Sequence, residues 1–270
     1  MFYSQIKHLK VSTFILGSNT FAGYSHQSEQ TDEEMRHYFT TARIKQINHE
    51  AETLGVNTLL ARTDFHMMRL LMEYWDEGGR IQWFAQTCPE VGDHAACIQR
   101  ARNYGAVACH IHGGVMDYLY ALDKLDEIPA AVDMIREKGM LAGIAAHNPE
   151  VIAWAEDHLD LDYYLCSYYN PIPRHKNPEH VAGTEEYFGE EDRAAMTDLI
   201  GTLSRPVIHY KIMAGGRNEP AAAFAFAASK MRANDAVCVG IYPKDHPSML
   251  REDVALLEQA LQPTRTVASS

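Results

Sequence analysis

The chain has 270 residues, of which 46% are hydrophobic and 22% charged, so it can bury a sizeable core and extensive disorder is not expected. Its formal net charge of -12 argues against nucleic acid and anionic membranes as partners. No apolar run approaches a membrane span, and from the composition of the N-terminal residues we expect no signal peptide. Five scattered cysteines without a CxxC pair indicate buried thiols in a reducing compartment, so we expect a cytoplasmic protein.

Eight short apolar runs alternate with longer amphipathic stretches along the chain. Each run has the length and composition of a strand buried on both faces, and several stretches begin with a cap and end at glycine. The predicted strands are residues 14–17, 56–61, 81–86, 106–111, 140–146, 161–167, 206–210 and 236–241. The predicted helices include residues 32–54, 93–104, 128–138, 150–158, 191–203, 220–231 and 248–261.

This alternation predicts one α/β domain over residues 1–270, a (β/α)8 TIM barrel of eight parallel strands with outer helices. An open doubly wound sheet is the alternative, but it usually has fewer strands, and no GxGxxG motif follows the first strand. The connection at about residues 171–190 is long and polar, and we expect it to lie over the barrel mouth. Residues 262–270 are expected to form a frayed tail.

Histidines gather where the predicted strands end, which is where barrels of this kind carry their chemistry. His110 and His112 end the fourth strand, His147 follows the fifth, and His209 lies in the seventh. If His112, His147 and His209 point inwards, three imidazoles converge, and Asp64 could add a carboxylate. Such a donor set suits zinc, manganese or iron. The alternative is that neighbouring groups satisfy these histidines, or that they act as plain acids and bases.

Further polar residues are expected at the same end of the barrel. Lys211 is interpreted as an electrostatic clamp or a Schiff-base amine, with a paired rim lysine as an equal alternative. The turn at residues 215–217 is a candidate anion site before a helix, although an ordinary glycine-rich turn is the commoner explanation. The loop after the sixth strand could close over a substrate. The candidate substrate-binding residues are Asn19, Tyr169, Asn170, Tyr210, Arg217 and, in that loop, Arg174.

These strand ends resemble the aldo-keto reductase superfamily in a divergent form, and the resemblance spans most of the chain. The segment GIAAHNPEVI at residues 143–152 is similar to that family's fifth-strand motif and the helix after it. The segment YNP at residues 169–171 is similar to the end of its sixth strand. The resemblance implies that His112 is the family's catalytic histidine and that Tyr210 stacks on nicotinamide.

Several positions depart from the family pattern. The family's proton donor is a tyrosine near the second strand, assisted by an aspartate there and by a lysine that ends the third strand. Here the second-strand stretch reads LARTDF at residues 60–65, without a tyrosine, and Thr87 and Cys88 end the third strand. Lys244 lies where the resemblance implies contact with the adenosine phosphate, but Asp245 beside it would repel a 2′-phosphate.

Three functions remain open. The favoured one is a metal-assisted lyase, epimerase or isomerase acting on a small carbonyl or sugar-like substrate, with a divalent zinc, manganese or iron ion. His112 or His147 would move protons, and Lys211 or Arg62 would hold the developing oxyanion. The alternative is an NAD(P)H-dependent oxidoreductase in which His112 replaces the missing donor. A non-catalytic barrel is the third, which the polar strand ends disfavour. The expected partner is a small molecule, and the sequence also allows a homo-oligomer.

Overall fold

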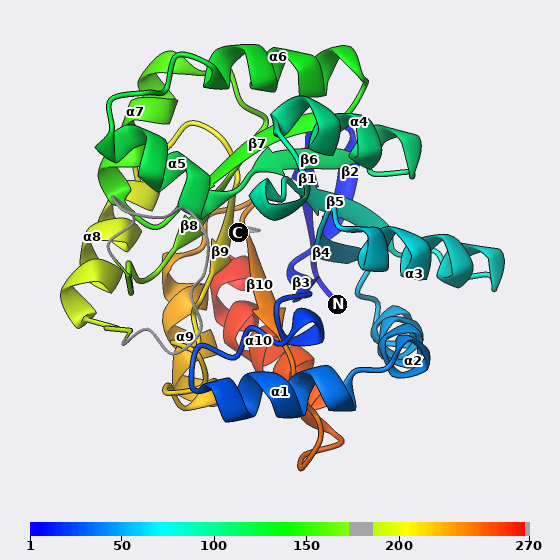
Figure 1. The fold of residues 1–270 in the computed structure, drawn as a ribbon. Helices are drawn as coiled ribbons and strands as arrows, with labels where there is room; N and C mark the ends of the chain where they lie inside the picture. Colours follow the sequence, from blue (N-terminus) through cyan, green and yellow to red (C-terminus); the bar gives the residue numbers. More distant parts are fainter. Residues whose placement is uncertain (173–185, 268–270) are drawn as a thin grey trace.

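The computed structural model describes residues 1–172 and 186–267, and Figure 1 shows a barrel surrounded by helices. The barrel is closed and its neighbouring strands run in the order β10-β3-β4-β5-β6-β7-β8-β9, all parallel. These strands are β3 (Phe14–Gly17), β4 (Thr58–Arg62), β5 (Gln82–Gln86), β6 (Ala108–Ile111), β7 (Leu141–Ala146), β8 (Tyr163–Ser167), β9 (Val207–Tyr210) and β10 (Ala236–Gly240). Each lies within or next to a predicted run, so the predicted (β/α)8 TIM barrel is confirmed.

Most helices on the outside of the barrel follow the prediction, but residues 32–54 and the C-terminal tail differ from it, and the helix at residues 113–121 is not among those predicted. The helices are α1 (Glu29–Tyr38), α2 (Thr41–Thr53), α3 (Phe65–Asp76), α4 (His94–Asn103), α5 (Gly113–Ala121), α6 (Ile128–Glu137), α7 (Pro149–His158), α8 (Glu190–Ile200), α9 (Pro220–Lys230) and α10 (Met249–Val267), with short turns η1 (Thr20–Ala22) and η2 (Pro89–Val91). The single helix predicted over residues 32–54 is two helices, because Thr40 caps α2 by accepting from the backbone N–H of Arg43. The predicted tail is helical through Val267.

An N-terminal hairpin that the sequence did not predict closes the N-terminal end of the barrel. Strands β1 (Tyr3–Ile6) and β2 (Leu9–Ser12) pair antiparallel, and Ile6 and Val11 pack against the side chains inside the barrel. The hydroxyl of Ser4 donates to the carbonyl of Asp235, just before β10, at 2.7 Å. Since this end is filled, a ligand of the barrel interior must enter from the C-terminal ends of the strands.

The barrel interior is apolar towards the N-terminal ends of the strands and polar towards their C-terminal ends. The apolar side chains form one cluster that includes Ile15, Leu60, Phe84, Tyr163, Leu165 and Ile208. The ring of Tyr163 covers Gly143, where an added Cβ would lie 2.6 Å from the ring carbon Cζ. Above this layer His110 is fully buried, 3.4 Å from Gln86 Oε1 and 3.5 Å from the hydroxyl of Tyr163. Burial lowers the pKa of His110 to about 3, so its imidazole is neutral.

His209 faces away from the barrel interior. Its neighbours Ile208 and Tyr210 pack with the interior cluster, so the alternation of β9 turns His209 towards the outer helices. There it is fully buried, with Nδ1 2.9 Å from the hydroxyl of Tyr168 and Nε2 3.3 Å from the carboxylate of Asp235. The predicted convergence of His209 with the other strand-end histidines, as a metal ligand, is therefore wrong.

Two expectations from composition can be compared with the structure. The five cysteines are free thiols, and four of them are buried. Within the described part of the chain, no helix has the length and apolar character needed to cross a membrane.

The outer polar cluster around Asp235 yields a stability prediction. Its carboxylate contacts His209 and accepts hydrogen bonds from the Arg232 guanidinium and the backbone N–H of Val207. Burial alone would raise the pKa of Asp235, but the bonds from His209 and Arg232 outweigh it and hold the pKa well below its usual range. We expect Asp235→Ala to lower the free energy of unfolding by about 3–5 kcal/mol, because buried partners lose their acceptor.

Urea unfolding of both proteins measures this loss. Because the folded pKa is depressed, the contribution is present above about pH 4 and is lost as the pH falls further, so the two proteins should converge in acid. Asp198→Ala is the control, since Asp198 is 77% exposed and pairs only at the surface with Lys230. Similar losses in both variants would contradict the prediction.

Candidate active site at the C-terminal end of the barrel

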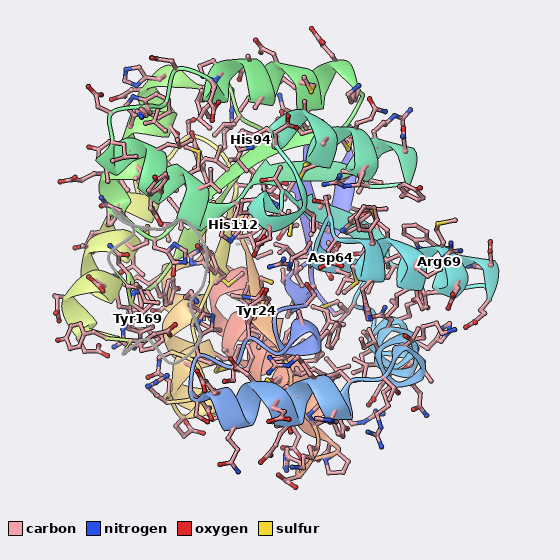
Figure 2. All side chains as sticks on the ribbon, in the orientation of Figure 1. Tyr24, Asp64, Arg69, His94, His112 and Tyr169 are labelled. Atoms are coloured by element: carbon pink, nitrogen blue, oxygen red, sulfur yellow. The ribbon has the colours of Figure 1, made fainter. Side chains whose placement is uncertain are left out.

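Polar side chains from several separate segments meet at the C-terminal end of the barrel. Figure 2 shows His112 and Tyr24 near the middle of the view, Asp64 to their right and Tyr169 to their left. They come from the N-cap of α5, the loop after η1, the N-cap of α3 and the segment after β8. These four residues therefore lie on segments that follow strands of the barrel.

His147, directly after β7, forms a dyad with Asp117 of α5. The imidazole Nδ1 lies 2.7 Å from the Asp117 carboxylate, and the side chains are only 7% and 5% exposed. The same carboxylate accepts from the backbone N–H groups of His147 and Asn148, each at 3.1 Å. Asp117 therefore fixes the tautomer in which Nδ1 carries the proton and makes Nε2 the nitrogen that can exchange a proton with a substrate.

Tyr210 and Gly113 complete the surroundings of this dyad. The half-buried ring of Tyr210 meets the His147 imidazole edge-on, with centroids 5.6 Å apart, and its hydroxyl donates to the Ala146 carbonyl at 3.2 Å. An added Cβ at Gly113 would lie 3.1 Å from the Tyr210 hydroxyl and 3.2 Å from His147 Cε1. A side chain at this position would crowd both rings.

His112 lies next to this group at the N-cap of α5. Its side chain is half-buried, and its backbone N–H donates to the hydroxyl of Thr87 at 3.0 Å. This bond ties the end of β6 to the end of β5. His112, next to Gly113 in the chain, thus lies at the same mouth as His147 and Tyr210.

Arg62, at the end of β4, is held by four side chains. Its Nη1 donates to the hydroxyl of Tyr24 at 3.0 Å and to Glu90 at 3.2 Å. Its Nη2 donates to the sulfur of Cys88 at 2.7 Å, and its Nε to Asp64 at 3.2 Å. Burial raises the pKa of Tyr24 while the Arg62 charge opposes the rise, so the phenol is protonated at neutral pH. The phenol and the guanidinium form a proton-donating pair at the mouth.

The predicted metal ligands do not form one group. They are Asp64, His112, His147 and His209. The Asp64 carboxylate caps α3 by accepting from the backbone N–H of Met67 at 2.9 Å and also pairs with Arg62. His209 lies on the other side of the barrel wall. Among the residues that the structure describes, no three His, Cys, Asp or Glu side chains are placed to hold a metal ion together.

The other predicted binding residues are spread around the mouth. Asn19 is exposed, whereas Tyr169 is buried and its hydroxyl accepts from Asn218 at 2.9 Å. Asn170 is half-buried, and its backbone N–H donates to Asp192. Most of the predicted mouth loop, including Arg174, lies at residues 173–185, outside the described residues. Lys211 contacts His26, which the sequence did not single out.

The candidate anion site at residues 215–217 is already occupied by the chain's own groups. Arg217 is exposed and donates to two loop carbonyl oxygens, at 3.0 and 2.9 Å. Glu219 caps α9, and its carboxylate accepts from the backbone N–H groups of Ala221 and Ala222 at 3.0 and 2.8 Å. The helix N-terminus therefore already binds a carboxylate, and the ordinary turn is the better interpretation.

A nicotinamide nucleotide fits this site at one end only. The half-buried ring of Tyr210 at the mouth offers an aromatic surface of the kind that holds a nicotinamide ring. Where the family resemblance implies contact with the adenosine phosphate, Lys244 is paired with Glu34 at 2.8 Å, and Arg251, a few residues further along the chain, is paired with Glu50 at 3.8 Å. Lys244 lines a surface cleft of about 510 Å3 beside α1, in which Glu33 and Glu34 also lie. These carboxylates do not suit a 2′-phosphate.

Sequence reasoning missed the partners that give these side chains their orientation. Asp117 is a buried acid on an otherwise apolar helix, and that exception to helical patterning is a signal that could have revealed it. Tyr24, Glu90 and His26 lie in irregular loops, where no periodicity indicates which way a side chain points.

No protein-family model matches this sequence, and no curated protein is similar to it. Its structure is similar to those of aldo-keto reductases. A proposed aldo-keto reductase from Pseudomonas aeruginosa has a TM-score of 0.64 and 17% identity, over 96% of this chain and 94% of that one. The holo form of an aldo-keto reductase from Bacillus halodurans gives 0.60 and 14%, over 97% and 96%. A glycerol dehydrogenase from Gluconobacter oxydans gives 0.55 and 11%, over 96% and 94%. At these identities the likeness concerns the fold.

The dyad predicts a specific tautomer for His147. When neutral, its imidazole should carry the proton on Nδ1, because the Asp117 carboxylate accepts there. Two-bond nitrogen–proton NMR correlation distinguishes the two tautomers, and His147→Gln assigns the resonance. Asp117→Asn should shift the balance towards Nε2–H. Finding the wild-type ring with its proton on Nε2 would rule out the dyad as described.

Proposed function

We propose that this chain is an NADH-dependent oxidoreductase of the aldo-keto reductase type that reduces a small aldehyde or ketone. The observation that carries the proposal is that the Tyr210–His147 contact and the Tyr24–Arg62 pair both lie on segments that follow barrel strands, and hence at the same end of the barrel. The aldo-keto reductases and the dehydrogenase among the structural neighbours support it. The metal-assisted reading is less well supported, because its four ligands are not brought together.

Bound NADH would supply the hydride, and the residues of this chain would bind the ring, orient the carbonyl and provide a proton. Tyr210 would hold the nicotinamide ring, with Gly113 leaving room beside it. Tyr24 is the better proton donor, because Arg62 lies 3.0 Å from its oxygen and would stabilise the phenolate that remains. His112 would then hydrogen-bond the carbonyl oxygen, as the family resemblance implies. The Tyr24–Arg62 pair would thus take the place of the missing second-strand donor.

The pairing of Lys244 and Arg251 with carboxylates favours NADH over NADPH. We expect NADH to bind about tenfold more tightly or better, because a 2′-phosphate placed beside Lys244 would meet the Glu34 carboxylate that already pairs with that lysine. Fluorescence titration with both nucleotides measures the two dissociation constants. Glu34→Gln should bring the dissociation constants for NADH and NADPH closer together, because it releases Lys244.

Glu73→Gln is the matched control, since Glu73 forms a comparable surface pair with Lys45 at 3.6 Å. Equal affinities in the wild-type protein would refute the predicted selectivity. If neither nucleotide binds, the oxidoreductase proposal itself is wrong.

Tyr24→Phe tests the proton donor. We expect the turnover of aldehydes with NADH to fall by about 10²–10⁴-fold, the range typical of a lost general acid, while the Kd for NADH stays unchanged. Tyr187→Phe is the control, because Tyr187 is also a tyrosine of the mouth loops but is 64% exposed. A panel of small aldehydes and ketones, followed by NADH absorbance, gives the rates. Full activity of Tyr24→Phe would return the donor role to His112.

A further inference from the structure

We propose that Lys211, His26 and Glu186 form a second reactive site at the barrel mouth, in which the Lys211 amine forms an imine with a small aldehyde or ketone. No step at this site uses a nicotinamide, so the proposal is independent of the oxidoreductase activity. It would give the same barrel a lyase- or isomerase-type chemistry that requires no metal.

The three side chains form a continuous hydrogen-bonded line. The Lys211 Nζ lies 2.8 Å from His26 Nε2, and His26 Nδ1 lies 2.8 and 3.0 Å from the two carboxylate oxygens of Glu186. They come from three segments: directly after β9, the loop between η1 and α1, and the residues before α8. The side chains of His26 and Glu186 are only 13% and 4% exposed. Water therefore screens these contacts little.

The arrangement gives a route to an uncharged amine. When Lys211 is an ammonium, it donates to His26, and the neutral imidazole donates through Nδ1 to Glu186. If one proton passes from Lys211 to His26, an imidazolium lies in direct contact with the carboxylate, and the lysine is left as a free base. Opposite charges attract more strongly when adjacent than when a ring separates them. Glu186 thus favours the state in which Lys211 is nucleophilic.

The backbone is strained where it presents these groups. The described chain has five non-glycine residues with positive φ, and His26 at 59°, Lys211 at 57° and Ala214 at 49° are three of them. Such conformations are strained for residues that carry a side chain, and they gather at functional sites. If β9 continued regularly, Lys211 would point outwards like His209. The left-handed turn redirects it across β10 towards the loop that carries His26.

The chemistry balances without an oxidant or reductant. The Lys211 amine adds to the carbonyl carbon, a C–N bond forms, and His26 passes a proton to the oxygen. Loss of water then converts C=O into C=N, with both hydrogens of the water coming from the amine. The protonated imine, which keeps the third hydrogen of the Lys211 ammonium, withdraws electrons from the neighbouring carbon, so a proton or a carbon–carbon bond there becomes easier to break.

Reductive trapping tests the proposal. The full-length protein is incubated with glycolaldehyde and sodium cyanoborohydride near neutral pH, and the modified lysines are located by peptide mass spectrometry. We expect Lys211 to be modified about tenfold or more faster than Lys230, a partly exposed surface lysine paired with Asp198. Lys211→Arg should remove this fast modification, and Lys230→Arg should leave it unchanged. Equal rates for Lys211 and Lys230 would overturn the proposal.

The Glu186→Gln variant tests whether Glu186 makes the Lys211 amine more nucleophilic or only positions His26. A neutral amide can still accept from His26 but cannot stabilise an imidazolium. Trapping at Lys211 should therefore slow about tenfold, and its pH profile should move up by about one unit, while thermal melting stays close to wild type. An unchanged pH profile in a folded variant would refute the role of Glu186 and with it the proposed line. Trapping at Lys211 in a protein that does not bind NADH would support this site and contradict the proposed oxidoreductase. NADH binding without trapping at Lys211 would support the oxidoreductase and contradict this site.

Discussion

The alternation of side chains along the barrel strands decides which polar groups of this chain can act together. In β9 this alternation points Tyr210 into the mouth. His209, one residue earlier, points into the layer between the barrel and the outer helices. His209 then stabilises the fold with Asp235, while Tyr210 meets His147. One residue of register thus separates a structural histidine from a site tyrosine, and it takes His209 away from the other predicted metal ligands.

The fold could be predicted from the sequence because the pattern that produces it, an apolar strand followed by an amphipathic helix, is repeated along the chain. Eight apolar runs between amphipathic stretches allow few architectures, and the strand bounds follow from the same periodicity. The N-terminal hairpin could not be predicted in this way, because its strands are short and only Ile6 and Val11 carry its contact with the interior. Helix α5 was missed because Gly113 and Gly114 at its start are poor helix formers.

The site was predictable in its place but not in its pairing. The topology brings the strand ends to one mouth, but the alternation of β9 turns His209 away from it. The partners of the strand-end residues come from loops and helix starts, where Asp117 orients His147 and Tyr24 binds Arg62. These contacts depend on how loops of irregular backbone pack together, which no local pattern of residues specifies. His26, which turns towards Lys211 through a positive φ, is the clearest case.

Carboxylates pair with the cationic side chains at the mouth and around it. The chain carries a net charge of -12, and the cations at its candidate phosphate positions are already neutralised by carboxylates. Arg62 is likewise bound by Asp64 and Glu90. The cations at this end therefore orient neighbouring groups and are already paired with carboxylates. Such a site would bind a phosphorylated compound less well than the small uncharged carbonyl compound of the proposed function.

In the proposed function, the nicotinamide ring and the carbonyl meet between Tyr210 and the Tyr24–Arg62 pair. A crystal structure of the protein grown with NADH tests it most directly. The account predicts the nicotinamide ring in van der Waals contact with Tyr210, about 3.5–4 Å away, with its reactive carbon open towards His112 and Tyr24. A nucleotide bound in the cleft beside α1 with the mouth empty, or with its nicotinamide away from Tyr210, would contradict it.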